Sequence, residues 1–533
     1  MTKNVSVEQT SNNTYDELPY ESYPYSASHP SHLRTMGMLF GMTPPSLEKA
    51  RILELGCAGG ANIIPLAMRY PNAECVGVDL SKVQIDAAKK QVKDLGLKNM
   101  DFRNASITDI DEKAYGKFDY IICHGVISWV PGAVQAAIFD VCGKLLTANG
   151  LAYVSYNTLP GWNMVRSIRD MMLYHSENFK TIGEKVQQSR LLLNFVKDSL
   201  EGSNSPYGDM LKKEAELLAQ QPDHYLRHDH LEEDNKQFYF NEFMKEAAGR
   251  KLQYLGDSNL ASMFLGNMPA AVVEKLQAVN DIVRTEQYMD FINNRRFRAT
   301  ILCRNDVALN RALNIETIKK FLLGFKLAPA KPMTEVKLDD TKENLEFYFN
   351  GVKEAPVSTT SPIMKAILYT FAENWGRHLA FAEIVKLAGA KLPSAKATDI
   401  EVELTNNAMR MVLSGHITIA AEEAPTTNKL SAKPKVLDLV RYQAEHTPAL
   451  WVTNGTHDRL GINIFEKFAF RYMDGKHSAE DLTTKLMEHV KKGDLVVSKD
   501  GVKIEDEKQI KTEIAAMVTQ TLERTKACSI LVD

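Results

Sequence analysis

Between Arg51 and about Pro160, short apolar runs alternate with stretches of helical periodicity. An apolar run of five or six residues has the length of a buried strand, and the stretches between the runs are long enough for helices. The expected strands are Arg51–Leu55, Glu74–Asp79, Met100–Asn104, Phe118–Cys123 and Leu151–Tyr156, and the expected helices are Asn62–Arg69, Ser81–Leu95 and Gly132–Leu146. This alternation predicts an α/β fold with a mainly parallel, doubly wound sheet and helices on both faces.

The rest of the chain is predicted to be mainly helical. A helix is expected at 30–40, and Ile182–Leu200 and Gln237–Lys251 have the clearest helical periodicity. Arg298–Cys303 is expected to be a strand that closes this helical part, and residues 328–345 and 422–435 are expected to be connections. Further elements are expected at 362–374, 381–387, 397–413, 417–420 and in a hairpin over 449–462. Helices followed by a small hairpin suggest winged-helix-like units.

Composition and charge limit the classes of protein to which this chain can belong. The 533 residues suggest three to four domains, and the 44% hydrophobic content is that of a globular protein. A formal net charge of −3 supplies no basic field for nucleic acid. No apolar stretch approaches the ~18 residues of a membrane-spanning helix, and the N-terminus is polar. Six irregularly spaced cysteines fit free thiols. We therefore expect a cytoplasmic protein without membrane insertion.

A glycine-rich loop, Glu54–Gly60, follows the first expected strand and leads into a helix. Glycine lets the backbone bend sharply and approach a ligand, and the next helix offers free N–H groups at its N-terminus. A glycine pattern of this kind also fits dinucleotide dehydrogenases, so other residues must decide which cofactor binds.

Three details bear on the cofactor. Glu54 ends the first strand, where it would repel a pyrophosphate and attract an ammonium or a sulfonium group. Asp79 ends the second strand, where a carboxylate can accept hydrogen bonds from both ribose hydroxyls. Ser106 and Ile107 follow the third strand and suit the edge and the face of an adenine ring. His124 follows the fourth strand, at the carboxyl edge where such sheets bind ligands.

Together these features resemble the class I S-adenosylmethionine-dependent methyltransferases, which have a Rossmann-like fold. The resemblance implies S-adenosylmethionine as cofactor and S-adenosylhomocysteine as product. Two residues depart from the common pattern, since many members have Asp in place of Ser106 and Gly in place of Ala58. The residues that the resemblance places around the cofactor are Tyr15, Tyr23, Glu54, Gly56, Cys57, Ala58, Gly60, Asp79, Leu80, Ser106, Ile107 and His124.

The segments around this core are more specific. They are Tyr15–Pro30, His124–Pro131, Tyr156–Trp162, Phe240–Ala247, Leu252–Leu255 and Arg296–Arg304. Their combination resembles bacterial methyltransferases with a methyltransferase regulatory domain, above all the rickettsial protein-lysine methyltransferases that modify an outer membrane surface protein. The resemblance implies a homodimer, and lysines of a protein substrate that are methylated in the cytoplasm before export. It also implies an N-terminal lid (1–45), a cofactor domain (46–163), a helical dimerisation element (164–230), a middle regulatory domain (231–327) and a winged-helix-like C-terminal domain (328–533).

Methyl transfer from a sulfonium is an in-line displacement, so the enzyme mainly positions the reactants and excludes water. A lysine must react as the neutral amine although its ordinary pKa is about 10.4. Aromatic rings suit this task because they hold a methylated ammonium without adding charge. Tyr156 is the preferred candidate for contact with the amine, and the other candidates at this edge are Trp129, His124, Asn157 and Ser128. The candidates for the lid are Tyr20, Tyr23, Tyr25 and His29.

Each candidate also has a structural interpretation. Trp129 and Trp162 fit a role as buried anchors of the core as well as they fit a role in the site. For His124, a hydrogen-bonding role is favoured over the role of a general base. The small side chain of Cys57 is sufficient reason for its place in the loop. His224, His228, His230 and Glu232 lack the spacing of a metal site, so no metal is expected.

Roughly 370 residues follow residue 163, which favours a protein substrate. A small-molecule methyltransferase and a non-catalytic regulatory protein with the same fold remain open as alternatives.

Overall fold

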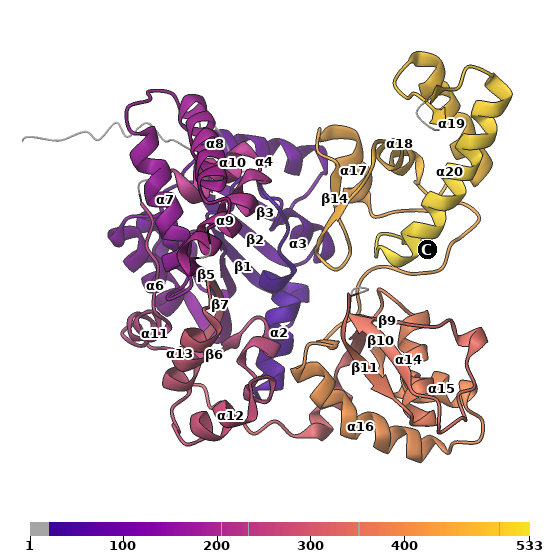
Figure 1. The fold of residues 1–533 in the computed structure, drawn as a ribbon, viewed down its shortest axis with the longest axis horizontal. Helices are drawn as coiled ribbons and strands as arrows, with labels where there is room; N and C mark the ends of the chain where they lie inside the picture. The colour runs from indigo at the N-terminus through magenta and orange to yellow at the C-terminus, as the bar shows by residue number, and fades with distance from the viewer. Residues whose placement is uncertain (1–20, 204, 233, 350–351, 500–501, 533) are drawn as a thin grey trace, which may run out of the picture. The chain divides into compact units, whose positions relative to one another are not determined.

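The computed structural model describes residues 21–532 except 204, 233, 350–351 and 500–501. The chain folds into two compact units, each built from several segments (Figure 1). Within the described residues, the first unit comprises 21–23, 45–254 and 274–307, and the second comprises 24–44, 255–273 and 308–532. The predicted five-part division of the chain stays a prediction. Among these residues, no helix is both long enough and apolar enough to cross a membrane.

A seven-stranded sheet organises the first unit. Its strand order is β3-β2-β1-β4-β5-β7-β6, and the first five strands in the chain are parallel. The strands are β1 (Arg51–Leu55), β2 (Glu74–Asp79), β3 (Met100–Asn104), β4 (Phe118–Cys123), β5 (Leu146–Asn157), β6 (Leu252–Asp257) and β7 (Phe297–Arg304). β1 lies between β2 and β4, so the direction of winding changes there, and ligands bind to such sheets at this switch point. The predicted α/β, Rossmann-like fold is confirmed.

The helices between the parallel strands are α3 (Ile64–Arg69), α4 (Lys82–Asp94), α5 (Glu112–Tyr115) and α6 (Gly132–Leu145). Three of them, α3, α4 and α6, occur where the sequence predicts them, and the short α5 was not predicted. The Ser81 hydroxyl accepts a hydrogen bond from the Gln84 N–H and so caps α4. The central strands β1 and β4 are almost wholly buried, as parallel strands between two helical layers are. The cysteines are free thiols, as predicted.

A helical region follows β5. It contains α7 (Trp162–Ser176), α8 (Ile182–Ser199), α9 (Pro206–Ala219) and α10 (Asp223–His230), which share a small apolar core. α11 (Phe240–Ala248), α12 (Ala270–Gln277) and α13 (Ile282–Asn293) precede β7. The strand predicted at Arg298–Cys303 exists, but it does not close a separate helical unit. β7 pairs antiparallel with β5 instead, because Ile301 and Leu302 are fully apolar and are buried in the main sheet.

The second unit contains α2 (Pro30–Leu39) and two small sheets, ordered β12-β8-β13 and β11-β10-β9. The strands are β8 (Leu322–Phe325), β9 (Leu327–Pro329), β10 (Leu345–Phe349), β11 (Val352–Thr359), β12 (Leu379–Ala380) and β13 (Ile417–Ala420), with helices α14 (Pro362–Glu373), α15 (Phe381–Lys391) and α16 (Ala397–Leu413). The prediction of a linker over 328–345 is wrong at both ends of that range, because a strand ends at Pro329 and another begins at Leu345. β9 and β10 pair there, and Leu345 and Phe347 alternate into the core.

The C-terminal part of the second unit has its own apolar core. It consists of α17 (Asp438–His446), β14 (Trp451–Thr453), β15 (Arg459–Gly461), α18 (Ile464–Tyr472), α19 (Ala479–Lys492), β16 (Ser498–Lys499), β17 (Val502–Lys503) and α20 (Glu507–Ala527). The hairpin predicted at 449–462 is confirmed by the β14–β15 pairing. Helices combined with short hairpins agree with the predicted winged-helix-like arrangement.

Candidate active site

The loop after β1 depends on its glycines. The backbone has positive φ at Gly56 (70°) and Gly60 (80°), which favours glycine. A Cβ at Gly56 would lie 2.4 Å from Cγ2 of Val126, in the loop after β4. The loops after β1 and β4 therefore pack against each other at the switch point of the sheet. Ala58 also has positive φ (44°), a strained conformation for alanine that glycine, the residue common at this position in class I methyltransferases, would relieve.

Asp79, at the end of β2, fastens this loop. Its Oδ2 accepts a hydrogen bond of 2.8 Å from the Ala58 N–H, and its Oδ1 accepts one of 2.9 Å from the Ser81 N–H. Leu80 beside it is exposed and offers an apolar surface at the same edge of the sheet. The position of Asp79 at the end of β2 fits the predicted contact with ribose, which stays a prediction. The hydrogen bond to the Ala58 N–H also gives Asp79 a structural role, because it holds Ala58 in its strained conformation.

The carboxyl of Glu54 has one oxygen without a hydrogen-bond partner. Its side chain is 3% exposed. Oε1 accepts a hydrogen bond of 2.7 Å from Nδ2 of Asn62, while Oε2 is buried and has no partner among the residues that the structure describes. The pKa of Glu54 is raised to about 8, mainly by burial; the hydrogen bond from Asn62 lowers this pKa and the charge of Asp79 raises it, and both effects are smaller than that of burial. Glu54 is thus mainly neutral at pH 7 without a cation beside it. An orphaned carboxyl oxygen at this position fits a ligand with an ammonium group.

The predicted adenine loop is engaged in local structure. The Ser106 hydroxyl lies 2.7 Å from Oγ1 of Thr108 and accepts a hydrogen bond from the Thr108 N–H. It thereby caps the short 3₁₀ turn Ile107–Asp109, and Ile107 is buried. The contact of these two residues with adenine stays a prediction.

Part of the N-terminal segment reaches the glycine loop. The Ser22 hydroxyl accepts a hydrogen bond of 3.1 Å from the Ala61 N–H, just after Gly60. Close by in the chain, the Tyr23 hydroxyl donates to Oε2 of Glu21 over 2.6 Å. The sequence analysis missed Ser22, since a lone serine in a tyrosine-rich segment carries no signal.

The other lid residues have different positions. Tyr15 and Tyr20 lie outside the described residues. Tyr25 and His29 belong to the second unit, where Nδ1 of His29 accepts the Ser31 N–H and caps α2. His29 therefore has a clear structural role at a helix terminus.

His124 follows β4 and lies in a polar cluster with β5. Its Nδ1 is 2.9 Å from the Tyr153 hydroxyl and 3.3 Å from the Ser155 hydroxyl. Ser155 also accepts a hydrogen bond of 2.8 Å from the Gly125 N–H. Burial lowers the pKa of His124 to about 4, so the ring is neutral at pH 7 and a weak base. This geometry favours the predicted hydrogen-bonding role. The sequence analysis missed Tyr153 and Ser155, because alternate residues of an apolar strand reveal no polar partner.

Asn157 is the last residue of β5 and is 7% exposed. Its backbone N–H donates to the Ser128 hydroxyl over 3.0 Å. Its side-chain Nδ2 is buried and has no hydrogen-bond partner in the described part of the chain. A buried amide without a partner is costly, so this group is poised to bind a ligand at the carboxyl end of β5.

Tyr156 was the preferred contact for the amine, and the structure argues against that prediction. The side chain is 1% exposed and stacks on Phe243 of α11 at 4.1 Å between ring centroids. Its hydroxyl lies 3.0 Å from Oγ1 of Thr300 in β7. Successive residues of a strand point to opposite faces, so Tyr156 and Asn157 cannot both face the same site. Tyr156 is a core residue here.

The two tryptophans near this edge lie edge to face, with ring centroids 5.9 Å apart. Trp162 is buried at the start of α7 and anchors that helix. Trp129 is half-buried, so it remains available at the surface of the site.

Two further sequence interpretations concern metals and thiols. Across the residues that the structure places, no group of three His, Cys, Asp or Glu side chains could hold a metal ion. His228 pairs with Glu232 at 3.5 Å. Burial raises the pKa of the Cys57 thiol well above its ordinary value, so this thiol is a poor nucleophile.

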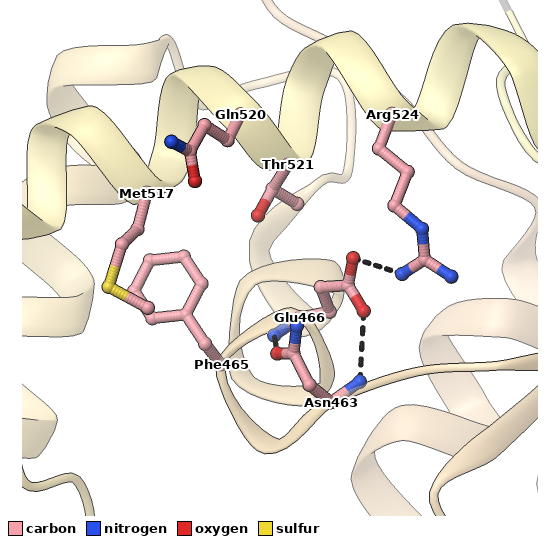
Figure 2. Close-up of a pocket in the computed structure, with 7 residues that line it drawn as sticks. All are labelled: Asn463, Phe465, Glu466, Met517, Gln520, Thr521 and Arg524. Carbon is pink, nitrogen blue, oxygen red and sulfur yellow. Dashed lines mark hydrogen bonds and ion pairs between the residues drawn. The ribbon is translucent and has the colours of Figure 1, made fainter.

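A pocket in the second unit lies between α18 and α20 (Figure 2). Glu466 dominates its lining: it accepts a hydrogen bond of 2.9 Å from the Asn463 N–H and pairs with Arg524. The two charged side chains satisfy each other in Figure 2, so the pocket presents no chemistry that calls for a ligand.

Comparison with known proteins agrees with this geometry. Three family models match: a methyltransferase domain over residues 53–152, a predicted methyltransferase regulatory domain over 222–304, and the C-terminal winged helix domain of PKMT over 432–529. The structure of PKMT2 from Rickettsia typhi is 40% identical, with a TM-score of 0.90, and the match covers 96% of this chain and 100% of that one. The chain belongs to the PKMT family.

Two more similarities bear on this family membership. PKMT2 from Rickettsia typhi in complex with AdoHcy matches with a TM-score of 0.90 and 40% identity over 97% of this chain and 100% of that one. The uncharacterized protein RP789 of Rickettsia prowazekii (strain Madrid E) is 57% identical over 98% of this chain and 94% of its own length. This PKMT-family protein is therefore a methyltransferase, and its cofactor is S-adenosylmethionine. The glycine loop, the orphaned oxygen of Glu54 and Asp79 fit that cofactor's amino acid and ribose parts.

Proposed function

We propose that this PKMT-family enzyme transfers methyl groups to lysine side chains of an outer membrane surface protein, in the cytoplasm and before export. The observation that carries the proposal is the buried side-chain amide of Asn157, whose Nδ2 has no partner among the described residues, at the carboxyl end of β5. The ring of His124 follows β4 at the same edge of the sheet, which also bears the cofactor loop. The family resemblance in the flanking segments supplies the substrate class.

In this proposal Asn157 orients the amine. Its side-chain oxygen accepts an N–H of the neutral amine, and Nδ2 donates to a carbonyl oxygen of the substrate. His124 stays uncharged, so it neither repels an arriving ammonium nor takes its proton, and the proton leaves to water. Trp129 contacts the methylated ammonium through its ring face. When bound, S-adenosylmethionine supplies a methyl group activated by the sulfonium.

The residues proposed to hold the cofactor are those of the first and second strand ends. Glu54 receives the ammonium, the loop at Gly56, Cys57, Ala58 and Gly60 lies along the amino acid part, and Asp79 accepts from the ribose. Leu80, Ser106 and Ile107 border the adenine, and Tyr23 covers the site from the N-terminal segment.

We also propose a homodimer that forms through the helical region α7–α9. The outward surfaces of these helices carry large exposed apolar side chains: Tyr174, Leu191, Phe195, Tyr207 and Leu217. Apolar patches of this kind mark protein contacts. Phe195→Glu should shift the sedimentation of the protein to that of a monomer.

The decisive test is incubation with radiolabelled S-adenosylmethionine and unfolded fragments of outer membrane protein, followed by mass spectrometry. Label on lysine is the expected result. Label only on small molecules would favour the alternative of a small-molecule methyltransferase, and binding of cofactor without any transfer would favour the non-catalytic alternative. Asn157→Ala should lower kcat by about 100-fold with an unchanged cofactor Kd, because it removes an orienting contact and not a cofactor contact.

A further inference from the structure

Two side chains of β5 hold the loop after β4 in place. The hydroxyl of Tyr153 lies 2.9 Å from Nδ1 of His124, and the hydroxyl of Ser155 accepts a hydrogen bond from the Gly125 N–H over 2.8 Å. Alternate residues of a strand point to the same face, so the side chains of Tyr153 and Ser155 share one face of β5 with that of Asn157. The loop is thus fastened beside the residue that is proposed to receive the lysine amine.

The hydroxyl hydrogen of Ser155 identifies which nitrogen of His124 carries the proton. Ser155 is 0% exposed, and its oxygen already accepts the Gly125 N–H, so its hydrogen must be donated to another group. In the described part of the chain, the contact that remains for this hydrogen is Nδ1 of His124, at 3.3 Å. A buried hydroxyl that fails to donate is costly, so Nδ1 accepts the bond. The ring is neutral at pH 7, and its one proton must therefore be on Nε2.

Further contacts fix the orientation of the His124 ring. Because Nδ1 carries no proton, the hydroxyl of the buried Tyr153 must be the donor in its contact with that nitrogen. The rings of His124 and Tyr153 stack with centroids 5.8 Å apart, and Phe297 of β7 lies edge to face with His124 at 6.2 Å. A flipped imidazole would place a carbon where Nδ1 stands and lose both hydroxyl contacts. The two hydroxyls therefore select one orientation and one tautomer of His124.

We propose that Ser155 and Tyr153 are positioning residues for methyl transfer, which set His124 as a hydrogen-bond donor through Nε2. Two hydroxyls engage the lone pair of Nδ1 and the proton occupies Nε2, so neither nitrogen can take a proton from a lysine ammonium. The proposal deepens the function proposed above, in which that proton leaves to water, and it rests on that function only in taking lysine as the methyl acceptor. The same two hydroxyls hold the loop that carries Trp129.

The tautomer is measured on the full-length protein with nitrogen-15-labelled histidine, by long-range proton–nitrogen correlation NMR at pH 7. The signals of His124 are those that disappear in His124→Gln, and the wild type should show an unprotonated Nδ1 and a protonated Nε2. Ser155→Ala removes one donor, so the Nδ1 resonance should move downfield, and Ser155→Thr, which keeps a hydroxyl, should restore it. Ser189→Ala is the matched control, because Ser189 is a buried serine of α8 whose hydroxyl donates to Lys185 O. This control should leave the His124 signals unchanged.

Methyl transfer to unfolded outer membrane protein fragments supplies the second measurement. Ser155→Ala should lower kcat roughly tenfold, because the loop after β4 is held less firmly, whereas Ser189→Ala should leave kcat unchanged. The amide of glutamine can place an N–H near the position of Nε2, and the shorter asparagine can place one only near Nδ1. His124→Gln should therefore keep a kcat about tenfold higher than that of His124→Asn.

Three results would overturn the proposal. The first is a protonated Nδ1 in the wild type, and the second is an Nδ1 resonance that Ser155→Ala leaves in place. The third is an equal loss of kcat in His124→Gln and His124→Asn, which is the result expected of a general base. If the wild type methylates no lysine at all, the proposed function fails, and the NMR experiment still decides the tautomer.

Discussion

Nδ2 of Asn62 donates a hydrogen bond to Oε1 of Glu54 over 2.7 Å, while the other oxygen of the same carboxyl is buried without a partner in the described part of the chain. Asn62 thus satisfies and fixes one half of the group and leaves the other half directed at a ligand. A buried carboxyl with half of its hydrogen bonds unmade favours the neutral form, which explains why burial raises the pKa of Glu54 to about 8.

Cofactor binding should depend on the ionisation of Glu54. An ammonium beside Oε2 favours the charged carboxylate, so the pKa of Glu54 falls on binding and a proton is released at pH 7. Affinity should therefore rise between pH 6 and 8, by up to about tenfold per pH unit, and level off near pH 8. Calorimetry in two buffers with different ionisation enthalpies counts the released proton.

Glu54→Gln is the matched control, since it keeps the shape and the bond to Asn62. It should bind S-adenosylmethionine more weakly at pH 8 and release no proton from this position. The variant should also remove a pH effect on the empty protein. Because the folded pKa lies above the unfolded one, ionisation of Glu54 destabilises the empty fold as pH rises from about 4.5 to 8. A wild-type Tm with the same pH dependence as the variant would contradict this role.

Replacement of Asp79 by Ala should weaken cofactor binding by roughly 1–3 kcal/mol. The structure adds a second consequence, since the same carboxylate accepts the Ala58 and Ser81 N–H groups. Loss of these bonds should lower the Tm of the empty protein as well. Asp79→Asn, which keeps one acceptor oxygen, should recover part of the Tm. Calorimetric Kd and Tm values for both variants check this, and an unchanged Kd would refute the ribose assignment.

Most local elements of the sheet were predictable, because strands such as β1, β2 and β4 are short apolar runs that end close to a distinctive residue. β1 ends just before Gly56, and β2 ends at Asp79, so both bounds are visible in the sequence. The carboxyl ends of parallel strands share one edge, which is why a linear motif such as Glu54 with Asp79 could predict a site.

Long-range pairings could not be predicted in this way. β7 joins β5 through residues about 150 positions apart in the chain, such as Ala152 and Leu302, and nothing in either segment specifies the partner. The face of the sheet to which the Tyr156 side chain points becomes clear only from that pairing, because the residues that it contacts, Phe243 and Thr300, come from α11 and β7. The choice of Tyr156 for contact with the amine stays a prediction, and the burial that follows from this pairing argues against it.

Gly56→Ala should disrupt the contact between the loops after β1 and β4. The new Cβ would lie 2.4 Å from Cγ2 of Val126, in addition to the strain of a φ of 70°. Gly96→Ala is the matched control, because Gly96 has a φ of 68° but nothing within 4 Å of its added Cβ. The control should lose about 1 kcal/mol of stability from strain alone, whereas Gly56→Ala should lose more and bind cofactor poorly. Urea unfolding and calorimetry measure both, and equal losses would mean that Val126 moves aside freely.

Tyr156→Phe separates the core role from a catalytic one. The substitution removes the hydroxyl that lies 3.0 Å from Oγ1 of Thr300 and keeps the stacked ring. It should lower the free energy of unfolding by about 1 kcal/mol, because the Thr300 hydroxyl loses a buried partner, and it should leave kcat/KM of the folded enzyme unchanged. Adding Thr300→Val removes both polar partners together, so the double variant should regain part of the stability lost in Tyr156→Phe. If Tyr156→Phe instead kept full stability and lost about 100-fold in kcat, the hydroxyl would act on the amine and the core interpretation would be wrong.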